Sequence, residues 1–275
     1  MLLSILFFLL SIIPSVWIFL WLGNRRKEDL SYRKSCKDSF LRGLFAVLPI
    51  LGISCLLFIA NSFLRFTLLK NHVLIYKAIY TFIVLALAEE IVKYTMFRKV
   101  LQKTDVPYSW ADVVAFMAII GTAFGLIEDI PYAIGADPIT MLVRGISMGH
   151  IGYGFLMGWF YGKKLYTGEK KYGVIAFGLP WLLHGLYDFS LTPELIKIND
   201  NFMFIGFCLA LFDIILIVLL IRFFKKARKT ERYQKPLVTP AEAKECVAPI
   251  RPDLSTNEDP NAPVCDDPDV SEVNK

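Results

Sequence analysis

Charged residues are scarce in this chain, and the sequence shows neither a disulfide framework nor a basic nucleic-acid-binding domain. Asp, Glu, Lys and Arg make up 20% of the 275 residues, below the roughly 25% of an average soluble domain. None of the five cysteines is placed where a disulfide would be expected, because each falls in a predicted cytoplasmic segment or inside a hydrophobic run. No basic folded domain accompanies the net charge of +5, so nucleic-acid binding is not expected.

Long hydrophobic runs dominate what is present. Hydrophobic residues make up 55% of the chain, the mean hydropathy is +0.50, and runs of roughly 18 to 23 residues, long enough to cross a bilayer, recur along it. The sequence predicts an all-α, polytopic transmembrane bundle of about seven helices. The predicted spans are Leu2–Leu22, Gly43–Leu64, Ala78–Phe97, Asp112–Ile134, Gly145–Gly162, Tyr172–Leu191 and Phe202–Ile221.

The positive charges predict the orientation of the bundle. Lys and Arg gather in alternate loops, at 23–42, 98–103, 163–171 and after 221, and short cytoplasmic loops are the ones that keep such an excess. The intervening loops hold only Arg65, Lys70, Lys77, Arg144 and Lys197. We therefore expect the N-terminus outside and the C-terminus in the cytoplasm of a multi-pass cell-membrane protein.

The chain divides by composition into two parts. Residues 1–222 form the predicted transmembrane domain. Residues 223–275 turn basic and then rich in proline and acidic residues, with too few apolar side chains to build a core. We expect this second part to be a disordered cytoplasmic tail.

Ionisable residues inside the predicted spans mark the candidate site. Each such group costs at least about 2.5 to 3.5 kcal/mol in a bilayer and is by default a functional hypothesis. They gather on four consecutive spans, as Glu89, Glu90 and Lys93, then Glu128 and Asp129, then His150, then His184 and Asp188. From the helix rise, these groups lie roughly 7 to 18 Å below the outer surface, in a single layer.

Ordinary structural interpretations exist for each residue. Glu89 and Lys93, four apart on one helix face, could simply neutralise one another. Asp129 could belong to an interfacial pair near the outer end of its span, and a lone histidine is often a hydrogen-bonded packing residue. Asp213 in the last span is expected to meet a polar neighbour or water. A shared site explains the common depth better than unrelated pairs do.

Four motifs resemble one known family. Glu89-Glu90-Ile91-Val92-Lys93 is similar to an E-E-x-x-K motif, and Phe124 to Glu128 is similar to F-x-x-x-E. Arg144 to His150 resembles the family's Arg and His helix, and His184 to Asp188 resembles H-x-x-x-D. In this order, one on each span, the motifs resemble the PrsW intramembrane proteases, relatives of the CAAX prenyl endopeptidases and of bacteriocin-processing membrane proteins. The resemblance covers about Ala78–Leu191.

The resemblance implies a membrane-embedded peptidase, of glutamate type or metal-dependent. Glu89 or Glu90 would be the general base, and Glu128 and His184 would complete the catalytic set. Lys93, Phe124, Arg144, His150 and Asp188 would support it. A metal, possibly zinc, would be held by Glu128, His150 and His184 across separate helices, because the helical H-E-x-x-H zinc motif is absent.

The expected substrate is a membrane-anchored protein, such as an anti-sigma-factor-like regulator, cut near the outer membrane boundary and in contact with the lipid bilayer. A proton- or ion-coupled transporter is the alternative, because it too would place carboxylates and histidines at mid-depth. The two related halves typical of such transporters are not visible in the sequence. A receptor or scaffold would not need a pair of glutamates in the hydrocarbon.

Overall fold

A computed structural model describes residues 2–53, 62, 72–103, 108–135, 144–145 and 147–238. The chain is helical there except for one short pair of strands. The elements in chain order are α1 (Leu2–Gly23), α2 (Leu30–Phe45), α4 (Val73–Ile79), η1 (Tyr80–Ala86), α5 (Leu87–Lys103), β1 (Tyr108–Ser109), α6 (Trp110–Gly135), α8 (Gly149–Thr167), α9 (Lys170–Ser190), α10 (Pro193–Ile198), α11 (Asn201–Ala227), η2 (Glu231–Tyr233) and β2 (Pro236–Val238).

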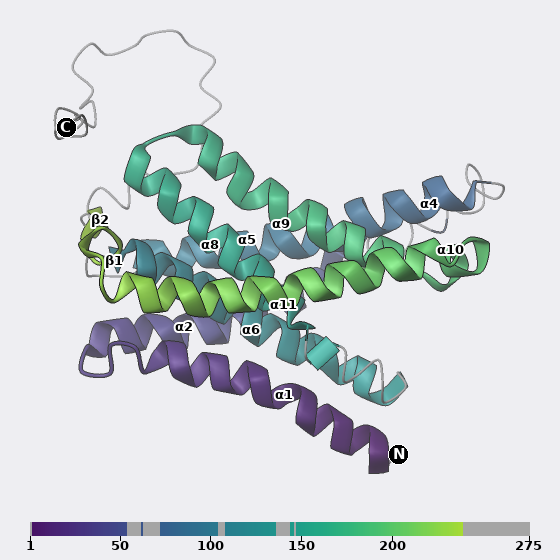
Figure 1. Cartoon of the computed structure of the whole chain (residues 1–275), viewed down its shortest axis with the longest axis horizontal. Helices are drawn as coiled ribbons and strands as arrows, with labels where there is room; N and C mark the ends of the chain where they lie inside the picture. The colour runs from purple at the N-terminus through teal and green to yellow at the C-terminus, as the bar shows by residue number, and fades with distance from the viewer. Residues whose placement is uncertain are drawn as a thin grey trace, which may run out of the picture.

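Helix α6 forms the centre of the bundle. Residues 110–124 are all buried, as expected for a helix that is apolar on every side. α6 packs against α8, α2 and α1, with α11 lying across the bundle in Figure 1. The contact with α8 is close because of glycines: a Cβ at Gly154 would lie 2.7 Å from the carbonyl oxygen of Met117. Small residues at membrane-helix interfaces commonly allow such a close approach.

The outer surface of the bundle is apolar. Large hydrophobic side chains such as Leu9, Ile13, Phe204, Phe207 and Ile215 are exposed on α1 and α11, which suits a lipid environment rather than water. Two helices, Trp110–Ile130 and Asn201–Ala227, are long and apolar enough to cross a membrane, and Phe8–Gly23 is a shorter apolar helix. The chain is thus an all-α protein with the character of a helical membrane protein.

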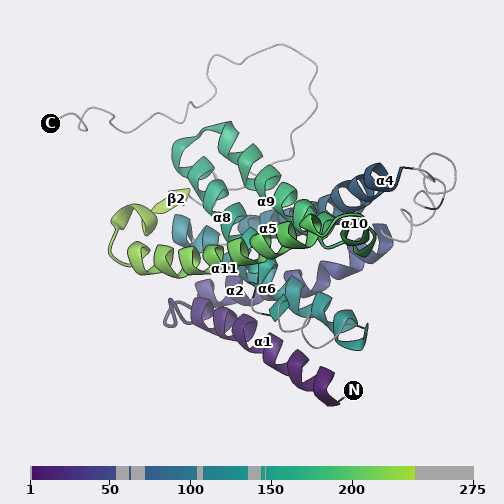
Figure 2. The same ribbon diagram turned by 45° about the vertical axis from the view of Figure 1, so that its right-hand side comes forward.

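The loops predicted to be cytoplasmic lie together at one end of the bundle. The α1–α2 turn, the α8–α9 turn and the β1–β2 pair share one end, whereas the N-terminus, α4 and α10 lie at the other (Figures 1 and 2). Arg25 and Arg26 of the α1–α2 turn both pair with Asp112 on α6, with 2.7 Å between Nη1 of Arg26 and Oδ2 of Asp112. This pairing ties the basic loop to the start of the central helix.

The helices differ from the sequence prediction at two places. The basic segment before the predicted second span forms a helix of its own, α2, because the Asp29 side chain accepts a hydrogen bond from the Tyr32 N–H and caps it. A turn at Ala46 ends α2, and residues 47–53, near the start of the predicted span, are helical again. Of the predicted second span, the structure describes residues 43–53 and 62, and the others lie outside the described residues. The fifth helix, α8, starts at Gly149 rather than Gly145, because Met148 adopts a left-handed conformation with φ of 49°. That break places His150 in the first turn of α8.

The folded part of the chain extends past the predicted boundary at residue 222. α11 continues to Ala227, and Phe223, Phe224 and Ala227 are buried. The buried Tyr233 packs against Trp110 with ring centroids 5.2 Å apart, and β2 pairs antiparallel with β1. The folded part extends further than predicted because apolar and aromatic side chains stand among the basic residues after 222 and pack against the bundle. The tail predicted beyond Val238 lies outside the described residues.

Candidate active site

The ionisable residues of the four predicted spans converge at one place. α5 supplies Glu89, Glu90 and Lys93; α6 supplies Phe124, Glu128 and Asp129; Arg144 and His150 precede and begin α8; and α9 supplies His184 and Asp188. Each contacts at least one other member of the set through an ion pair, a hydrogen bond or a ring contact. The structure therefore brings together every residue that the sequence selected.

A π-helical stretch precedes the two glutamates. η1 spans Tyr80–Ala86 in the middle of the helix that continues into α5, and such stretches are frequent at functional sites. The carbonyl oxygen of Phe82 accepts hydrogen bonds from the Leu87 N–H and, at 2.8 Å, from Nε1 of Trp181 on α9. Gly185 lets α9 approach, since a Cβ there would lie 2.5 Å from the Phe82 ring. This junction fixes α5 against the helix that carries His184.

Lys93 is buried at the centre of the site and pairs mainly with Glu90. Both side chains are 1% exposed, and Nζ of Lys93 lies 2.5 Å from Oε1 of Glu90 but 3.8 Å from Oε2 of Glu89. The ammonium also lies 4.5 Å from the ring centroid of Phe124 and 3.0 Å from Nδ1 of His150. The simple neutralisation of Glu89 by Lys93 is thus not what the structure contains.

His184 is held between carboxylates. Its Nδ1 lies 2.9 Å from Oε1 of Glu90, and its Nε2 lies 3.3 Å from Oδ2 of Asp188 and 3.7 Å from Oε2 of Glu89. A carboxylate at one ring nitrogen orients the imidazole and leaves the other nitrogen directed at its target, as in carboxylate–histidine–metal arrangements. Nε2 of His184 is accordingly the nitrogen that faces the other site residues.

His150 belongs to a second chain of contacts. Because a lysine ammonium only donates, Nδ1 of His150 accepts from Lys93, and Nε2 contacts Oε2 of Glu128. Arg144 bridges the neighbouring acids, with Nη2 3.1 Å from Oε1 of Glu128 and Nε 2.9 Å from Oδ1 of Asp129. Glu128 therefore connects His150 to Arg144, whereas the ion pair of Asp129 among the described residues is with Arg144.

Glu89 carries the unsatisfied atom of the site. Its Oε2 is buried and has no hydrogen-bond partner among the described residues; the two nearby nitrogens, on His184 and Lys93, lie beyond hydrogen-bond distance. A buried oxygen of this kind calls for a water or an ion. Ligand atoms of Glu89, His150 and His184 lie within 4.8 Å of one another, so Glu89 takes the place that the sequence prediction gave to Glu128.

This set fits a metal ion. One carboxylate and two imidazoles match the nitrogen and oxygen ligands of zinc, and the orphan oxygen of Glu89 lies 3.7 Å from Nε2 of His184. Both ring nitrogens of His150 already have contacts, with Lys93 and Glu128, and those of His184 contact Glu90 and Asp188. A cation bound through either histidine would therefore replace one of those contacts.

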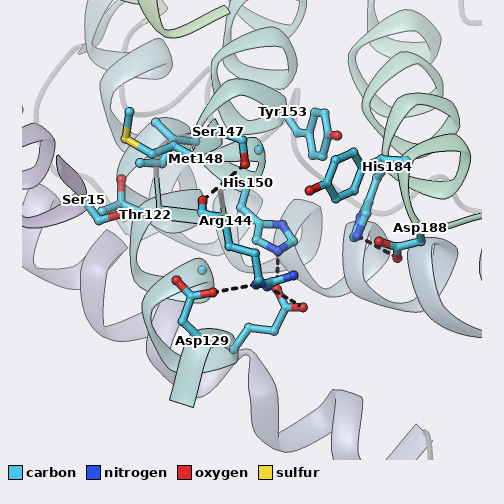
Figure 3. A pocket seen from close by; sticks show the side chains of 16 residues that line it. Ser15, Thr122, Asp129, Arg144, Ser147, Met148, His150, Tyr153, His184 and Asp188 are labelled. Carbon is cyan, nitrogen blue, oxygen red and sulfur yellow. Dashed lines mark hydrogen bonds and ion pairs between the residues drawn. The ribbon is translucent and has the colours of Figure 1, made fainter. Parts of the chain in front are cut away.

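A small polar cavity opens beside the histidines (Figure 3). Its volume is about 50 Å³, and because a single water needs roughly 10 to 15 Å³ measured in this way, it has room for more than one. His150 and His184 both line it, with Asp188 beside His184 and Arg144 beside His150. Ser15 of α1 and Thr122 of α6 contribute to its wall. Water can thus reach the histidines inside an otherwise apolar bundle.

Sequence reasoning did not identify Tyr153 as part of the site. This tyrosine lines the cavity, and its ring stacks on His184 with centroids 5.6 Å apart. Asp213, for which the sequence predicts a polar neighbour or water, accepts a hydrogen bond from the Tyr153 hydroxyl at 3.3 Å. The signal available in the sequence was the carboxylate of Asp213 in an apolar span.

Comparison with protein families gives a match over most of the chain. The sequence profile of the family described as PrsW family intramembrane metalloproteases matches residues 39–220. This range includes all four helices that supply the site.

Individual relatives agree with the family match. The protease PrsW of Oceanobacillus iheyensis is 27% identical over 159 residues, covering 56% of this chain and 74% of the relative. The protease PrsW of Geobacillus kaustophilus is 27% identical over 162 residues, covering 56% and 66%. That of Clostridioides difficile is 26% identical over 200 residues, covering 68% and 79%. Among solved structures, none matches the chain significantly.

Proposed function

This chain belongs to the PrsW family of intramembrane metalloproteases, and from that premise we propose that it cleaves membrane-anchored proteins with water activated at Glu89, His150 and His184. It is a membrane peptidase. The family match favours this function over the transporter that the sequence left as an alternative. The observation that carries the proposed site is the buried Oε2 of Glu89, which has no hydrogen-bond partner among the described residues and belongs to a carboxylate grouped with His150 and His184.

Glu89, rather than Glu90, is the carboxylate that meets the reacting water. Oε1 of Glu90 is occupied by both Lys93 and His184, so removing a water proton with it would break a buried ion pair. Oε2 of Glu89 has no hydrogen-bond partner among the described residues, and its nearest cationic groups, Lys93 and His184, lie 3.8 and 3.7 Å away. Glu90 acts instead on His184, whose Nδ1 it holds.

Glu89, His150 and His184 would hold the metal of the family. When bound, a metal of this kind polarises a carbonyl oxygen and lowers the pKa of a bound water. The protein groups around it have their own tasks: Lys93 neutralises Glu90, and Arg144 neutralises Glu128. Each of these pairings neutralises one acid of the buried cluster before substrate arrives.

The cavity supports water entry from the side of Glu128 and Asp188. These two acids line it, whereas Glu89 does not, and both lie near the ends of their helices that the charge pattern assigns to the outer surface. With seven spans, the N-terminus outside and the C-terminus in the cytoplasm, the substrate would be cut near its outer membrane boundary. An anti-sigma-factor-like, single-pass regulator is the substrate class proposed.

Reconstituted protein and single-pass reporters of known orientation test the proposal. The wild-type chain is expected to cut a reporter near its outer boundary, with the new terminus mapped by mass spectrometry. Glu89→Gln should abolish the product, and zinc retention measured in the same variant separates two roles. Lost zinc would identify Glu89 as a ligand, and retained zinc would identify it as the proton acceptor. A cut at the cytoplasmic boundary would refute the proposed orientation of the site.

A further inference from the structure

Asp213 is a buried carboxylate that the proposed reaction does not yet use. It lies within α11, an apolar helix long enough to span a membrane, and is 1% exposed. Among the described residues no Lys, Arg or His nitrogen lies within salt-bridge distance of it. An acid kept at this depth without a cation is costly. Its hydrogen-bond partner therefore indicates what the carboxylate does.

That partner, Tyr153, links Asp213 to the candidate active site. The Tyr153 hydroxyl donates to Oδ2 of Asp213 at 3.3 Å. The ring of the same tyrosine lies nearly parallel to the imidazole of His184, at 5.6 Å between centroids and 25° between planes. It also meets His150 edge-on, at 6.4 Å. One end of Tyr153 is thus fixed on α11 while its face covers a histidine of α9.

The start of α8 leaves room for this carboxylate. A Cβ at Gly149 would lie 2.9 Å from Oδ2 of Asp213, closer than real Cβ contacts allow, so glycine lets α11 approach. Gly149 directly precedes His150 and follows the left-handed Met148. Asp213 is therefore held between the first turn of α8 and the Tyr153 hydroxyl.

We propose that Asp213 and Tyr153 form a positioning pair that holds the imidazole of His184 in its working orientation. Glu90 and Asp188 hold the edges of that imidazole through its two nitrogens, and Tyr153 covers its face. Asp213 prevents Tyr153 from rotating away, because the hydroxyl would then lose its buried acceptor. Neither residue touches the substrate. The inference rests on the proposed function, in which His184 acts at the reacting water.

The competing interpretation is that the pair only joins α8 to α11. In that case, loss of the hydrogen bond would reduce the stability and abundance of the protein, and the turnover of the remaining folded molecules would be unchanged. A positioning role instead lowers kcat of folded molecules while KM stays nearly constant. The two interpretations therefore differ in a measurable quantity.

The test uses the full-length chain in proteoliposomes with a cleavable single-pass reporter. We expect Asp213→Ala and Tyr153→Phe each to lower kcat about tenfold, in the range found for residues that orient a metal-binding histidine. The double variant should lose no more than either single variant, since the two residues act as one unit. Asp213→Asn should restore kcat to within about twofold of the wild type, because its amide oxygen still accepts the tyrosine proton.

The matched control is Tyr161→Phe, which removes a hydroxyl from another buried tyrosine of α8 that packs on Phe97 and Tyr94. It should keep the kcat of the wild type. Zn²⁺ affinity, measured by chelator competition, is the readout independent of cleavage and should weaken about tenfold in Asp213→Ala. The positioning pair is refuted if Asp213→Ala folds and keeps the kcat and the Zn²⁺ affinity of the wild type. It is also refuted if the losses of kcat in the two single variants add up in the double variant.

The zinc measurement separates this inference from the proposed function. A wild-type protein that cleaves no reporter but binds Zn²⁺ more tightly than Asp213→Ala would refute only the proposed reaction. A wild-type protein that neither cleaves nor binds Zn²⁺ would refute both.

Discussion

Oε1 of Glu90 lies 2.9 Å from Nδ1 of His184, across 94 residues of sequence. The carboxylate sits beside one ring nitrogen and thereby directs the other, Nε2, toward Glu89 and Asp188. Two adjacent glutamates thus have different surroundings: Oε1 of Glu90 contacts both Lys93 and His184, whereas Oε2 of Glu89 has no hydrogen-bond partner among the described residues. Neighbouring acids with different surroundings are a common way to divide catalytic tasks.

The two glutamates should respond differently to the same substitution. Glu89→Gln should lower the cleavage rate by about 10² to 10⁴, the usual contribution of a general base, with little loss of folded protein. Glu90→Gln leaves the buried Lys93 charge with only its longer contact to Glu89, at 3.8 Å, and should cost about 3 to 5 kcal/mol of stability. Reporter cleavage and thermal unfolding in detergent check both expectations. Wild-type cleavage by Glu89→Gln would remove Glu89 from the reaction.

The acids bound by Arg144 should also differ. Glu128 contacts both Arg144 and His150, so Glu128→Gln should lower the cleavage rate by about 10- to 100-fold, as expected for groups that orient a ligand. The ion pair of Asp129 among the described residues is with Arg144, and Asp129→Asn should stay within about threefold of the wild type, because Arg144 keeps its pair with Glu128. Equal losses of cleavage rate in the two variants would contradict the prediction that Glu128 matters more to cleavage than Asp129.

Truncation should locate the true end of the folded part. A chain ending at Val238 should match the full-length protein in abundance and cleavage, because Tyr233 with its aromatic contacts and β2 remain. A chain ending at Lys229 loses Tyr233, which packs on Trp110 and Trp159. We expect about 3 to 5 kcal/mol less stability for that chain, the usual cost of removing a buried aromatic side chain. Normal stability after truncation at Lys229 would show that these contacts contribute little.

Cysteine labelling can test the orientation, but Cys36 is a poor reporter of it. Cys36 is 2% exposed, and burial raises the pKa of its thiol to about 12, so little reactive thiolate forms at neutral pH. Glu28→Cys, in the α1–α2 turn, and Lys197→Cys, in α10, are exposed positions at opposite ends of the bundle and are better reporters. With Cys36 replaced by Ser, an impermeant reagent applied to intact cells should label position 197 and spare position 28. The reverse pattern would invert the predicted topology.

The sequence alone determined the helical class and selected most of the residues that converge in the candidate site. Apolar runs of membrane length predict helices whatever their partners are, and each charged residue within such a run is conspicuous because it is costly there. The described part of the chain accordingly has helices in the predicted places, and Glu89, Glu90, His150 and His184 converge. Boundaries set by local backbone detail, such as the Asp29 cap and the Met148 break, were missed.

Only the tertiary structure decided which residue contacts which. Spacing along α5 suggested that Lys93 pairs with Glu89, but His184 on α9 draws Glu90 into the same cluster and makes Glu90 the closer partner. The link from Asp213 through Tyr153 to His184 likewise joins three separate helices. Helical periodicity fixes the face on which a side chain lies, whereas its partner depends on how closely neighbouring helices approach. Here glycines such as Gly149 and Gly185 set that approach.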